Sequence, residues 1–216
     1  TGAVDSGTAL IDALIQSGRS LILTSSLTAV PVLDNFDRIW VQLGMFPSNH
    51  TLTTQEGDLL DTYLTNGIGG DALYLEGGDT WFFDPQTSVH ARFGITALAD
   101  GASVDDLALI VGFEATGCDL SGLNFDYSDD ENTWVDRLAA NVGSSVVQSN
   151  DSPAYDVAVH RNTGTFKTFG ASYELGGLIA GASTRLELIE ALVQCLADIL
   201  IPVSDLVCSV SGSSVQ

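Results

Sequence analysis

The stretch FDRIWVQLGMFPSNHTLTTQEGDLLDTYLTNGIGGDALYLEGGD, residues 36–79, carries the pattern that decides the fold. Its first part, residues 36–44, is a nearly continuous apolar run closed by a glycine, and residues 71–79 repeat that pattern. Between them, residues 53–67 place apolar side chains at helical spacing behind a Thr-x-x-Glu capping signature. A strand, a helix and a second strand at this interval predict a right-handed βαβ unit of a parallel sheet.

The same alternation continues on both sides of this unit. Residues 5–18 and 183–200 predict helices, and residues 19–26 and 165–174 predict strands. The strands are nearly continuously apolar, as expected where helices cover both faces of a sheet. We therefore predict an α/β fold, a three-layer sandwich with a mainly parallel sheet. Only four residues precede the first helix, where such folds normally open with a strand, so that strand is very short or another segment fills its place.

Two regions depart from the pattern. Between about residues 95 and 165, short apolar runs alternate with Gly, Asp, Asn and Ser, which indicates an irregular β-rich insertion. Residues 202–216 alternate apolar and small residues after Pro202, which indicates a linker or the first strand of a following β module. The expected organisation is one α/β domain over residues 1–201 and this separate tail.

The charge of the chain is strongly lopsided. It has 28 acidic against 7 basic residues among 216, a formal net charge of −21, while 45% of its residues are hydrophobic. Such a surface repels nucleic acid, so we exclude a nucleic-acid function. No apolar run reaches the length of a membrane span, so we expect no membrane insertion. The acidity suits solubility in salty or extracellular surroundings, or the binding of divalent cations.

The cysteines and two short motifs bear on the compartment. Cys195 and Cys208 are close enough in sequence to form a disulfide in an oxidising compartment; the alternative is that these two and Cys118 are ordinary buried thiols. Asn49 and Asn150 each begin an Asn-x-Ser/Thr glycosylation motif, a pattern that is common by chance.

Three segments of the chain resemble a known family. They are residues 36–67, residues 72–87 (ALYLEGGDTWFFDPQT) and residues 167–178. They are similar to the class I glutamine-amidotransferase-like domain, and more closely to its non-enzymatic relatives in large secreted bacterial surface proteins. The resemblance implies a flavodoxin-like sandwich in an extracellular or cell-surface protein. The tail resembles the opening strand of a fibronectin type III-like module.

Active members of that family carry a Cys on the turn after the third strand, and a His and a Glu late in the chain. Here residues 76–80 read EGGDT without a Cys, and Tyr173 stands near the expected His, so only Glu174 remains. A carboxylate that orients a missing base does no chemistry alone. The resemblance therefore implies no enzyme and no cofactor, but a structural or interaction module.

The turn after residues 71–76 still holds candidate site residues. Glu76, Asp79 and Trp81 are candidates for ligand binding, since open α/β sheets bind ligands at the carboxyl ends of their strands. Asp79 has three interpretations: it caps a following helix, it binds a ligand, or it acts with His90 and Glu174 in a hydrolase. Trp81 fits the core or a ligand surface, and the glycines before Asp79 provide a positive φ or a close backbone approach.

An acidic loop carries a third functional hypothesis. Asp126, Asp129, Asp130 and Glu131 lie within six residues, and Asp136 follows in the same acidic stretch, although the spacing of an EF-hand is absent. Carboxylate-rich loops supply the oxygen ligands that Ca²⁺ requires. The loop is therefore either a solvated acidic surface or a calcium site, and the second case predicts a calcium-dependent adhesion module.

Self-association is a further expectation. The first strand of the sheet is missing, and the strand-like tail has no sheet of its own. Unpaired strands are templates for strand addition, so the tail could pair with a neighbouring copy and form a dimer or a filament; the alternative is a flexible tail on a monomer. The expected partners are thus another protein or a second copy of the chain.

Overall fold

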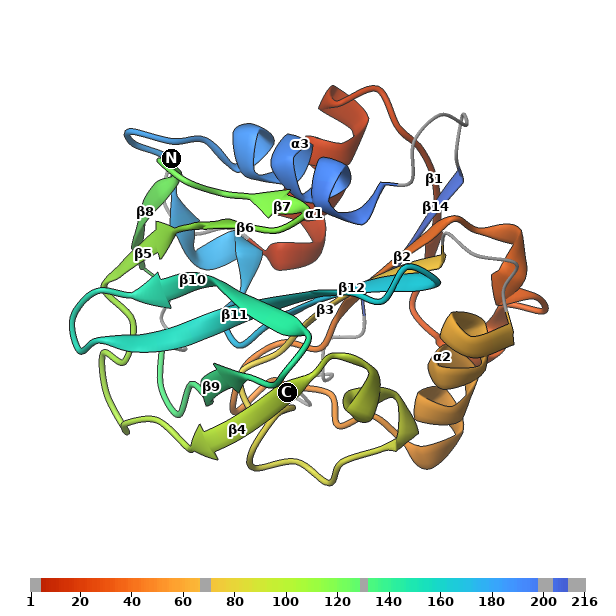
Figure 1. Cartoon of the computed structure of the whole chain (residues 1–216), viewed down its shortest axis with the longest axis horizontal. Coiled ribbons are helices and arrows are strands. Elements are labelled where there is room, and N and C mark those ends of the chain that lie inside the picture. The colour runs from red at the N-terminus through yellow and green to blue at the C-terminus, as the bar shows by residue number, and fades with distance from the viewer. Residues whose placement is uncertain (1–4, 67–70, 129–131, 198–203, 210–216) are drawn as a thin grey trace, which may run out of the picture.

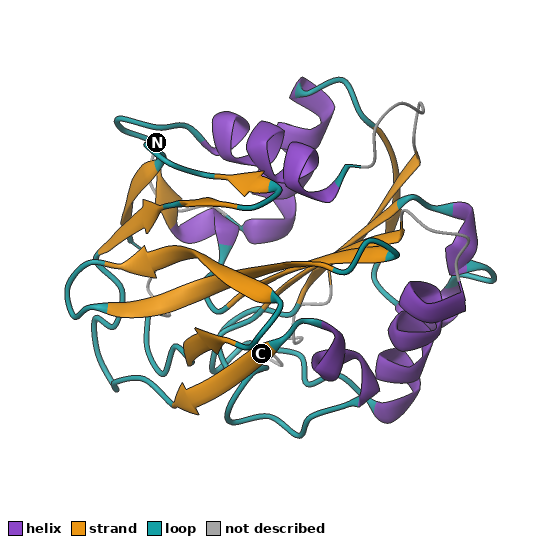
Figure 2. Cartoon of the chain, viewed as in Figure 1, coloured by secondary structure: helices purple, strands orange, loops and turns teal. Residues whose placement is uncertain are grey.

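A computed structural model describes residues 5–66, 71–128, 132–197 and 204–209 of the chain (Figure 1). Within these residues it is a mixed α/β structure with three α-helices, one sheet of twelve strands and a separate two-stranded ribbon (Figure 2). The helices are α1 (Ser6–Gln16), α2 (Thr54–Asn66) and α3 (Arg185–Leu196), and the short 3₁₀ helices are η1 (Leu27–Ala29), η2 (Leu33–Asn35), η3 (Ser88–Arg92) and η4 (Leu175–Gly177).

One half of the large sheet is parallel. Its strands follow the order β1-β14-β2-β3-β12, and each is parallel to its neighbours. Their bounds are β1 (Ser20–Thr24), β14 (Ser204–Ser209), β2 (Arg38–Gln42), β3 (Asp71–Glu76) and β12 (Phe166–Ala171). The predicted unit over residues 36–79 is confirmed as β2, α2 and β3.

The predicted helices are present, and each begins at the residue whose side chain can cap it. The Asp5 carboxylate accepts the Thr8 N–H at 2.7 Å at the start of α1. The Glu56 carboxylate accepts the Thr53 N–H at 2.9 Å at the start of α2. Thr184 and Glu187 form a reciprocal capping box at the start of α3. These bonds satisfy amide groups that have no partner within the helix.

Helices cover both faces of the parallel half. In Figure 1, α1 and α3 lie on one face and α2 on the other. The strand alternation matches this arrangement: Trp40 and Tyr74 belong to the apolar cluster that includes α1 and α3, whereas Ile39 and Leu73 belong to the cluster that includes α2. All four side chains are fully buried, which accounts for the continuous apolar character of the strands.

We predicted that the tail is separate from the domain, but its described residues are part of the large sheet. Residues 204–209 form β14, which lies between β1 and β2 in the large sheet. The prediction of a linker or of the first strand of another module is therefore wrong for these residues. The place of the missing first strand is taken by β14 from the chain itself, which removes the observation that motivated strand exchange between copies. Pairing with a neighbouring copy stays a prediction.

The other half of the sheet is antiparallel, so the expected mainly parallel sheet is confirmed only in part. The order continues from β12 through β11, β10, β5, β8 and β13, while β4 and β9 pair beside β11. These strands are β4 (Ile95–Ala99), β5 (Leu109–Gly112), β8 (Asn124–Tyr127), β9 (Arg137–Ala140), β10 (Ser144–Asn150), β11 (Tyr155–Asn162) and β13 (Leu178–Ile179); the separate ribbon is β6 (Glu114–Ala115) with β7 (Cys118–Asp119). The expected β-rich stretch between about 95 and 165 thus extends the sheet.

The disulfide prediction named the wrong partner. Cys118 in β7 bonds to Cys195 in α3, with their Cα atoms 4.4 Å apart. Cys208 is a buried free thiol in β14 and belongs to the apolar cluster on the opposite side of the sheet from Cys195. Proximity in sequence was misleading here because Cys195 and Cys208 belong to the apolar clusters on opposite faces of the sheet.

One of the two glycosylation predictions does not fit the structure. The Asn150 side chain is 1% exposed, and its amide accepts the Ala108 N–H at 2.9 Å and donates to the Pro153 carbonyl at 2.8 Å. A buried amide with these partners is closed to modification in the folded protein. Asn49 lies in a partly exposed loop, and its glycosylation stays a prediction. Among the described residues, no helix has the length and apolar character that a membrane crossing needs.

Candidate ligand-binding site

The turn after β3 brings the chain over the end of the sheet at close range. A Cβ on Gly77 would lie 3.1 Å from the Leu43 Cβ, and a Cβ on Gly78 would lie 3.2 Å from the Met45 Cγ. Neither glycine is among the residues with positive φ, so close packing is the requirement. The two glycines let the turn descend onto the end of β2 and place Asp79 at the carboxyl edge of the sheet.

Asp79 caps no helix in the described structure, so the first of its three interpretations is wrong. The chain continues as a turn, closed by the Asp84 N–H donating to the Asp79 carbonyl at 2.8 Å. The next helix, η3, is capped by Thr87 and His90. The Asp79 carboxylate has no hydrogen-bond partner within the described residues, and its residue is only 3% exposed.

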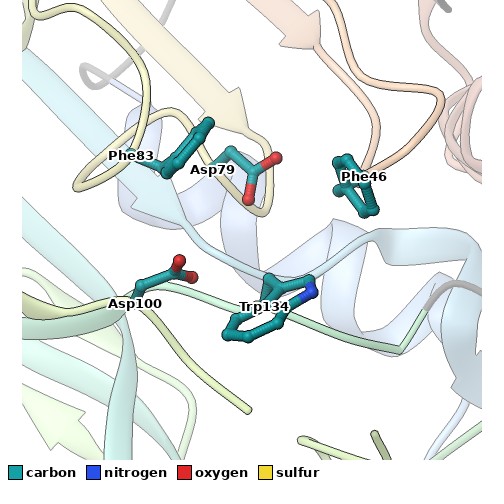
Figure 3. Close-up of a pocket in the computed structure, with 5 residues that line it drawn as sticks. All are labelled: Phe46, Asp79, Phe83, Asp100 and Trp134. Carbon is teal, nitrogen blue, oxygen red and sulfur yellow. The ribbon is translucent and has the colours of Figure 1, made fainter. Parts of the chain in front are cut away.

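A cavity of about 270 Å³ opens in front of Asp79. Its lining combines two carboxylates with three aromatic rings from four separate segments: Phe46 after β2, Asp79 and Phe83 after β3, Asp100 after β4, and Trp134 before β9. Figure 3 shows these five side chains arranged around a common space. The cavity therefore joins the parallel half of the sheet to the segments next to β4 and β9.

A strap formed by residues 134–136 fixes the geometry of the cavity. The Asp136 N–H donates to the Gly78 carbonyl at 3.0 Å. The Asp136 carboxylate accepts the N–H groups of Trp81 and Phe82, both at 2.8 Å. These bonds tie the strap to the turn on both sides of Asp79, so the walls are held before any ligand arrives.

Trp134 adopts a backbone conformation that is unusual for a large residue. Its φ is 57°, in the left-handed region that costs about 1–3 kcal/mol for a residue other than glycine. Neighbouring bonds hold it there: the Trp134 N–H donates to the Ala102 carbonyl at 2.6 Å, and the next N–H, of Val135, donates to the buried Asp106 carboxylate at 3.1 Å. Such conformations concentrate at functional sites, and here it sets the indole against the cavity.

The carboxylates around the cavity repel one another. Burial, with the neighbouring charges of Asp84 and Asp100, raises the pKa of Asp79 to about 6. Burial also raises the pKa of Asp100. Burial raises the pKa of Asp136 to about 8, against the lowering effect of its two backbone donors, and the Asp136 Oδ1 has no hydrogen-bond partner in the described part of the chain. All seven basic residues of the protein lie in that part, and none lines the cavity.

The hydrolase arrangement does not assemble. His90 is buried, and the Thr87 N–H donates to its Nδ1 at 2.9 Å while its Nε2 lies 3.1 Å from the Thr80 hydroxyl. Burial lowers the pKa of His90, and the lone pair of its Nδ1 already accepts the Thr87 N–H. Neither His90 nor Glu174 lines the Asp79 cavity in the described structure. Within the described residues, neither His90 nor Glu174 is therefore placed to act on Asp79 as the hydrolase hypothesis requires.

Two of the three ligand-binding candidates are structural instead. Glu76 is fully buried and is bonded by Tyr74, by the Gln42 amide at 3.1 Å and by the Leu175 N–H at 3.2 Å. Trp81 is 4% exposed, and its indole N–H donates to the Ala171 carbonyl at 2.9 Å. Only Asp79 of the three faces the cavity.

The calcium candidates are tested only at one position. Asp126 is exposed on β8, while Asp129, Asp130 and Glu131 lie outside the described residues. Within the described ranges, no group of three or more His, Cys, Asp or Glu side chains is arranged to hold a metal ion.

Sequence reasoning missed Phe46, Asp100 and Trp134, and it considered Asp136 only as part of the acidic stretch. Phe46 follows the strand next to β3, so the rule that ligands gather at neighbouring strand ends contained the signal for it. The other three come from the irregular stretch, where periodicity gives no information on which loop reaches the sheet. Their convergence depends on the pairing of β4 with β9 and of β9 with β11.

No protein-family model and no curated protein matches the chain. Among solved structures, a β-galactosidase from Rahnella sp. R3 is similar with a TM-score of 0.59 and 12% identity, over 87% of this chain and 26% of that one. An exo-β-1,4-mannosidase from Opitutaceae bacterium strain TAV5 is similar with a TM-score of 0.54 and 10% identity, over 87% and 28%. A cytoplasmic protein from Salmonella typhimurium has a TM-score of 0.51 and 11% identity, over 88% and 87%.

The chain spans about a quarter of the length of each of the two glycosidases, but most of the length of the Salmonella protein. Identities of 10–12% establish a shared fold alone.

Proposed function

We propose that this chain is a non-catalytic interaction module of an extracellular or cell-surface protein, and that it binds its ligand or partner in the Asp79 cavity. The observation that carries the proposal is a preformed cavity with a buried carboxylate that, among the described residues, has no hydrogen-bond partner and no histidine beside it. Asp79 lies 3% exposed at the carboxyl edge of the sheet, where α/β folds hold ligands.

Two occupied N–H groups of the turn argue against acyl transfer at this site. Acyl transfer needs backbone N–H groups that are free to receive a developing oxyanion. The Trp81 and Phe82 N–H groups, which follow Asp79 on the turn, already donate to Asp136. A negatively charged intermediate would have to displace a carboxylate that the fold holds in place.

The disulfide supports an oxidising compartment. Cys118 and Cys195 are 77 residues apart in sequence and join β7 to α3. Stable disulfides are typical of secreted and extracytoplasmic proteins and rare where thiols are kept reduced. The strong net negative charge of the chain agrees with that setting.

We also infer that the parallel half is a flavodoxin-like unit of the amidotransferase-like type. In the flavodoxin-like order, the first strand of the chain lies between the second and the third. Here β14 holds that place, between β1 and β2. Helices on both faces support a three-layer arrangement around these strands.

The proposal is tested by assaying the purified chain against chromogenic amides, esters and glycosides. We expect no turnover above buffer. Turnover that disappears in Asp79→Asn or Asp136→Asn would overturn the proposal. A second measurement is a thiol titration of protein purified without reductant: one reactive thiol, that of Cys208, is expected after denaturation, whereas three would contradict the oxidising compartment.

A calcium-dependent adhesion module stays a hypothesis, because three of its four candidate ligands lie outside the described residues. Assembly into dimers or filaments likewise stays a prediction.

A further inference from the structure

The Asp79 carboxylate is buried, but no cation or hydrogen-bond donor among the described residues is paired with it. A buried carboxylate is normally paired with a cation or surrounded by hydrogen-bond donors, since an isolated buried charge is costly. Asp79 is 3% exposed, forms no hydrogen bond within the described residues, and faces an open space (Figure 3). A ligand that supplied a donor and a positive charge would complete this site.

That positive charge has to come from outside the chain. Other basic side chains are already engaged: Arg38 bonds to Asp205 at 3.1 Å, Arg92 bonds to Asp61 at 2.6 Å, and Arg185 donates to the Gly176 carbonyl at 2.7 Å. None of the seven basic residues lines the cavity. Asp100 adds a second carboxylate to the same wall and increases the preference for a cation.

The aromatic walls select the kind of cation. Phe46, Phe83 and Trp134 line the cavity, and their rings attract organic cations through their negative faces. A hydrated metal ion gains little from such walls, and Ca²⁺ requires six to eight oxygen ligands. A neutral sugar could stack on the rings, but it would leave the repulsion between Asp79 and Asp100 uncompensated.

From these observations we infer that the cavity binds an alkylammonium group, whose N–H bonds reach Asp79 while its methylene groups contact Phe46, Phe83 and Trp134. The cavity of about 270 Å³ suits one such head group and its short chain. The inference rests on the proposed function and names the ligand chemistry of that site. The group has two sources with the same chemistry, a free amine or a lysine side chain of a protein partner.

The test is an NMR titration of the ¹⁵N-labelled chain with n-butylammonium, which has the chemistry of a lysine side chain. We expect saturable shifts of the Trp134 indole N–H and of the amides of residues 79–83, with a Kd in the millimolar range. The neutral control, n-butanol, should bind at least about tenfold more weakly, because it lacks the charge that pairs with Asp79. Equal binding of the two probes would overturn the inference.

The variants assign the effect to the carboxylate. Asp79→Asn keeps the shape of the side chain and should weaken n-butylammonium binding at least about tenfold. Asp12→Asn, an exposed position on α1, makes the same change in net charge and should alter binding by less than about twofold. Asp100→Asn provides a second variant should Asp79→Asn fold poorly, and it should weaken binding in the same direction. Equal binding by wild type, Asp79→Asn and Asp100→Asn would overturn the inference.

Two further probes separate the ligand sources and the rival chemistries. Nα-acetyl-lysine methylamide binding at least as tightly as n-butylammonium points to a lysine of a protein partner, and weaker binding points to a free amine. Shifts of the same resonances by CaCl₂ or by methyl β-galactoside, without a response to n-butylammonium, would contradict the ammonium assignment. Such results would leave the non-catalytic module intact, whereas only turnover in the substrate assays overturns that proposal.

Discussion

Glu76 and Asp79 are three residues apart on the same turn, yet their surroundings are opposite. Both are acidic, both are nearly or fully buried, and burial raises the pKa of each, to about 7 for Glu76 and to about 6 for Asp79. Glu76 is held by donors from β2, β3 and η4, with Gln42, Tyr74 and Leu175 contributing one each. Asp79 has none in the described structure and faces a cavity.

The difference separates an architectural carboxylate from one that is ready for a ligand. The bonds of Glu76 join the end of the parallel sheet to the layer of α1 and α3, so its burial is compensated within the fold. The burial of Asp79 is not compensated within the described structure, so its desolvation lowers the stability of the fold. A ligand that binds in the cavity can supply the missing donor. Burial and the direction of the pKa shift are the same for Glu76 and Asp79. The number of hydrogen-bond donors that contact each carboxylate distinguishes them.

The largest expected effect is on stability at Glu76. Glu76→Ala leaves the Tyr74 hydroxyl, the Gln42 amide and the Leu175 N–H without their partner, and we expect it to lower the free energy of unfolding by about 3 kcal/mol. Asp79→Ala removes an uncompensated buried carboxylate, so it should change the free energy of unfolding by less than about 1 kcal/mol. Urea denaturation at neutral pH measures both, and a larger loss in Asp79→Ala would invalidate the contrast.

The next effect concerns Asp136, which lies beside Asp79 and makes the free energy of unfolding depend on pH. Its pKa rises from an ordinary 3.8 to about 8, so the folded state holds the proton more tightly than the unfolded state. Stability from this group therefore falls as pH rises between about 4 and 8. Asp136→Asn cannot titrate there but keeps an oxygen for the Trp81 and Phe82 N–H groups.

The free energy of unfolding of Asp136→Asn, relative to wild type, should increase by at least about 2 kcal/mol between about pH 5 and pH 8. The charges that face this group, Asp79 and Asp100, act in the same direction because both raise its pKa. Urea denaturation at several pH values measures the difference, with Asp12→Asn as the control. Parallel stability curves for wild type and Asp136→Asn would show that Asp136 does not titrate in this range.

The smallest effect distinguishes two adjacent aromatic residues on the turn. Phe82 and Phe83 are 49% and 68% exposed, but only Phe83 lines the cavity. Replacing either by Ala should change the free energy of unfolding by less than about 0.5 kcal/mol. Phe83→Ala should weaken n-butylammonium binding by about threefold through the lost cation–π contact, and Phe82→Ala should leave it unchanged. Equal effects of the two variants on binding would remove Phe83 from the site.

Much of the parallel half could be predicted from the sequence because its signals are local. The caps of α1, α2 and α3 and the apolar runs of β2 and β3 lie within short windows, and each element is present in the structure. The partner of a strand is not a local property. Nothing in residues 204–209 reveals that they pair with β1 and β2, and the partner of Cys195 depends on which face of the sheet each segment occupies.

The candidate site was predictable only at its centre. Asp79 follows a strand and two glycines, so general rules of α/β folds point to it. Asp79 is a candidate for ligand binding because no donor of the described structure bonds to it. The Trp81 and Phe82 N–H groups, which follow it on the turn, donate to Asp136 instead. The walls at Asp100 and Trp134 come from segments whose position is set by antiparallel pairing far along the chain.

The position of β14 has a consequence for the order of events during synthesis. The α1 helix and β1 are made near the start of the chain, but β1 meets the rest of the sheet through β14, a strand from its other end. The parallel half therefore cannot close around α1 until residues 204–209 have left the ribosome. Until then the apolar faces of β1 and β2 stay open, a state in which long-range strand pairing is slow and aggregation competes. A chain with this topology should gain more than most from a chaperone that shields α1 and β1 until β14 has been made.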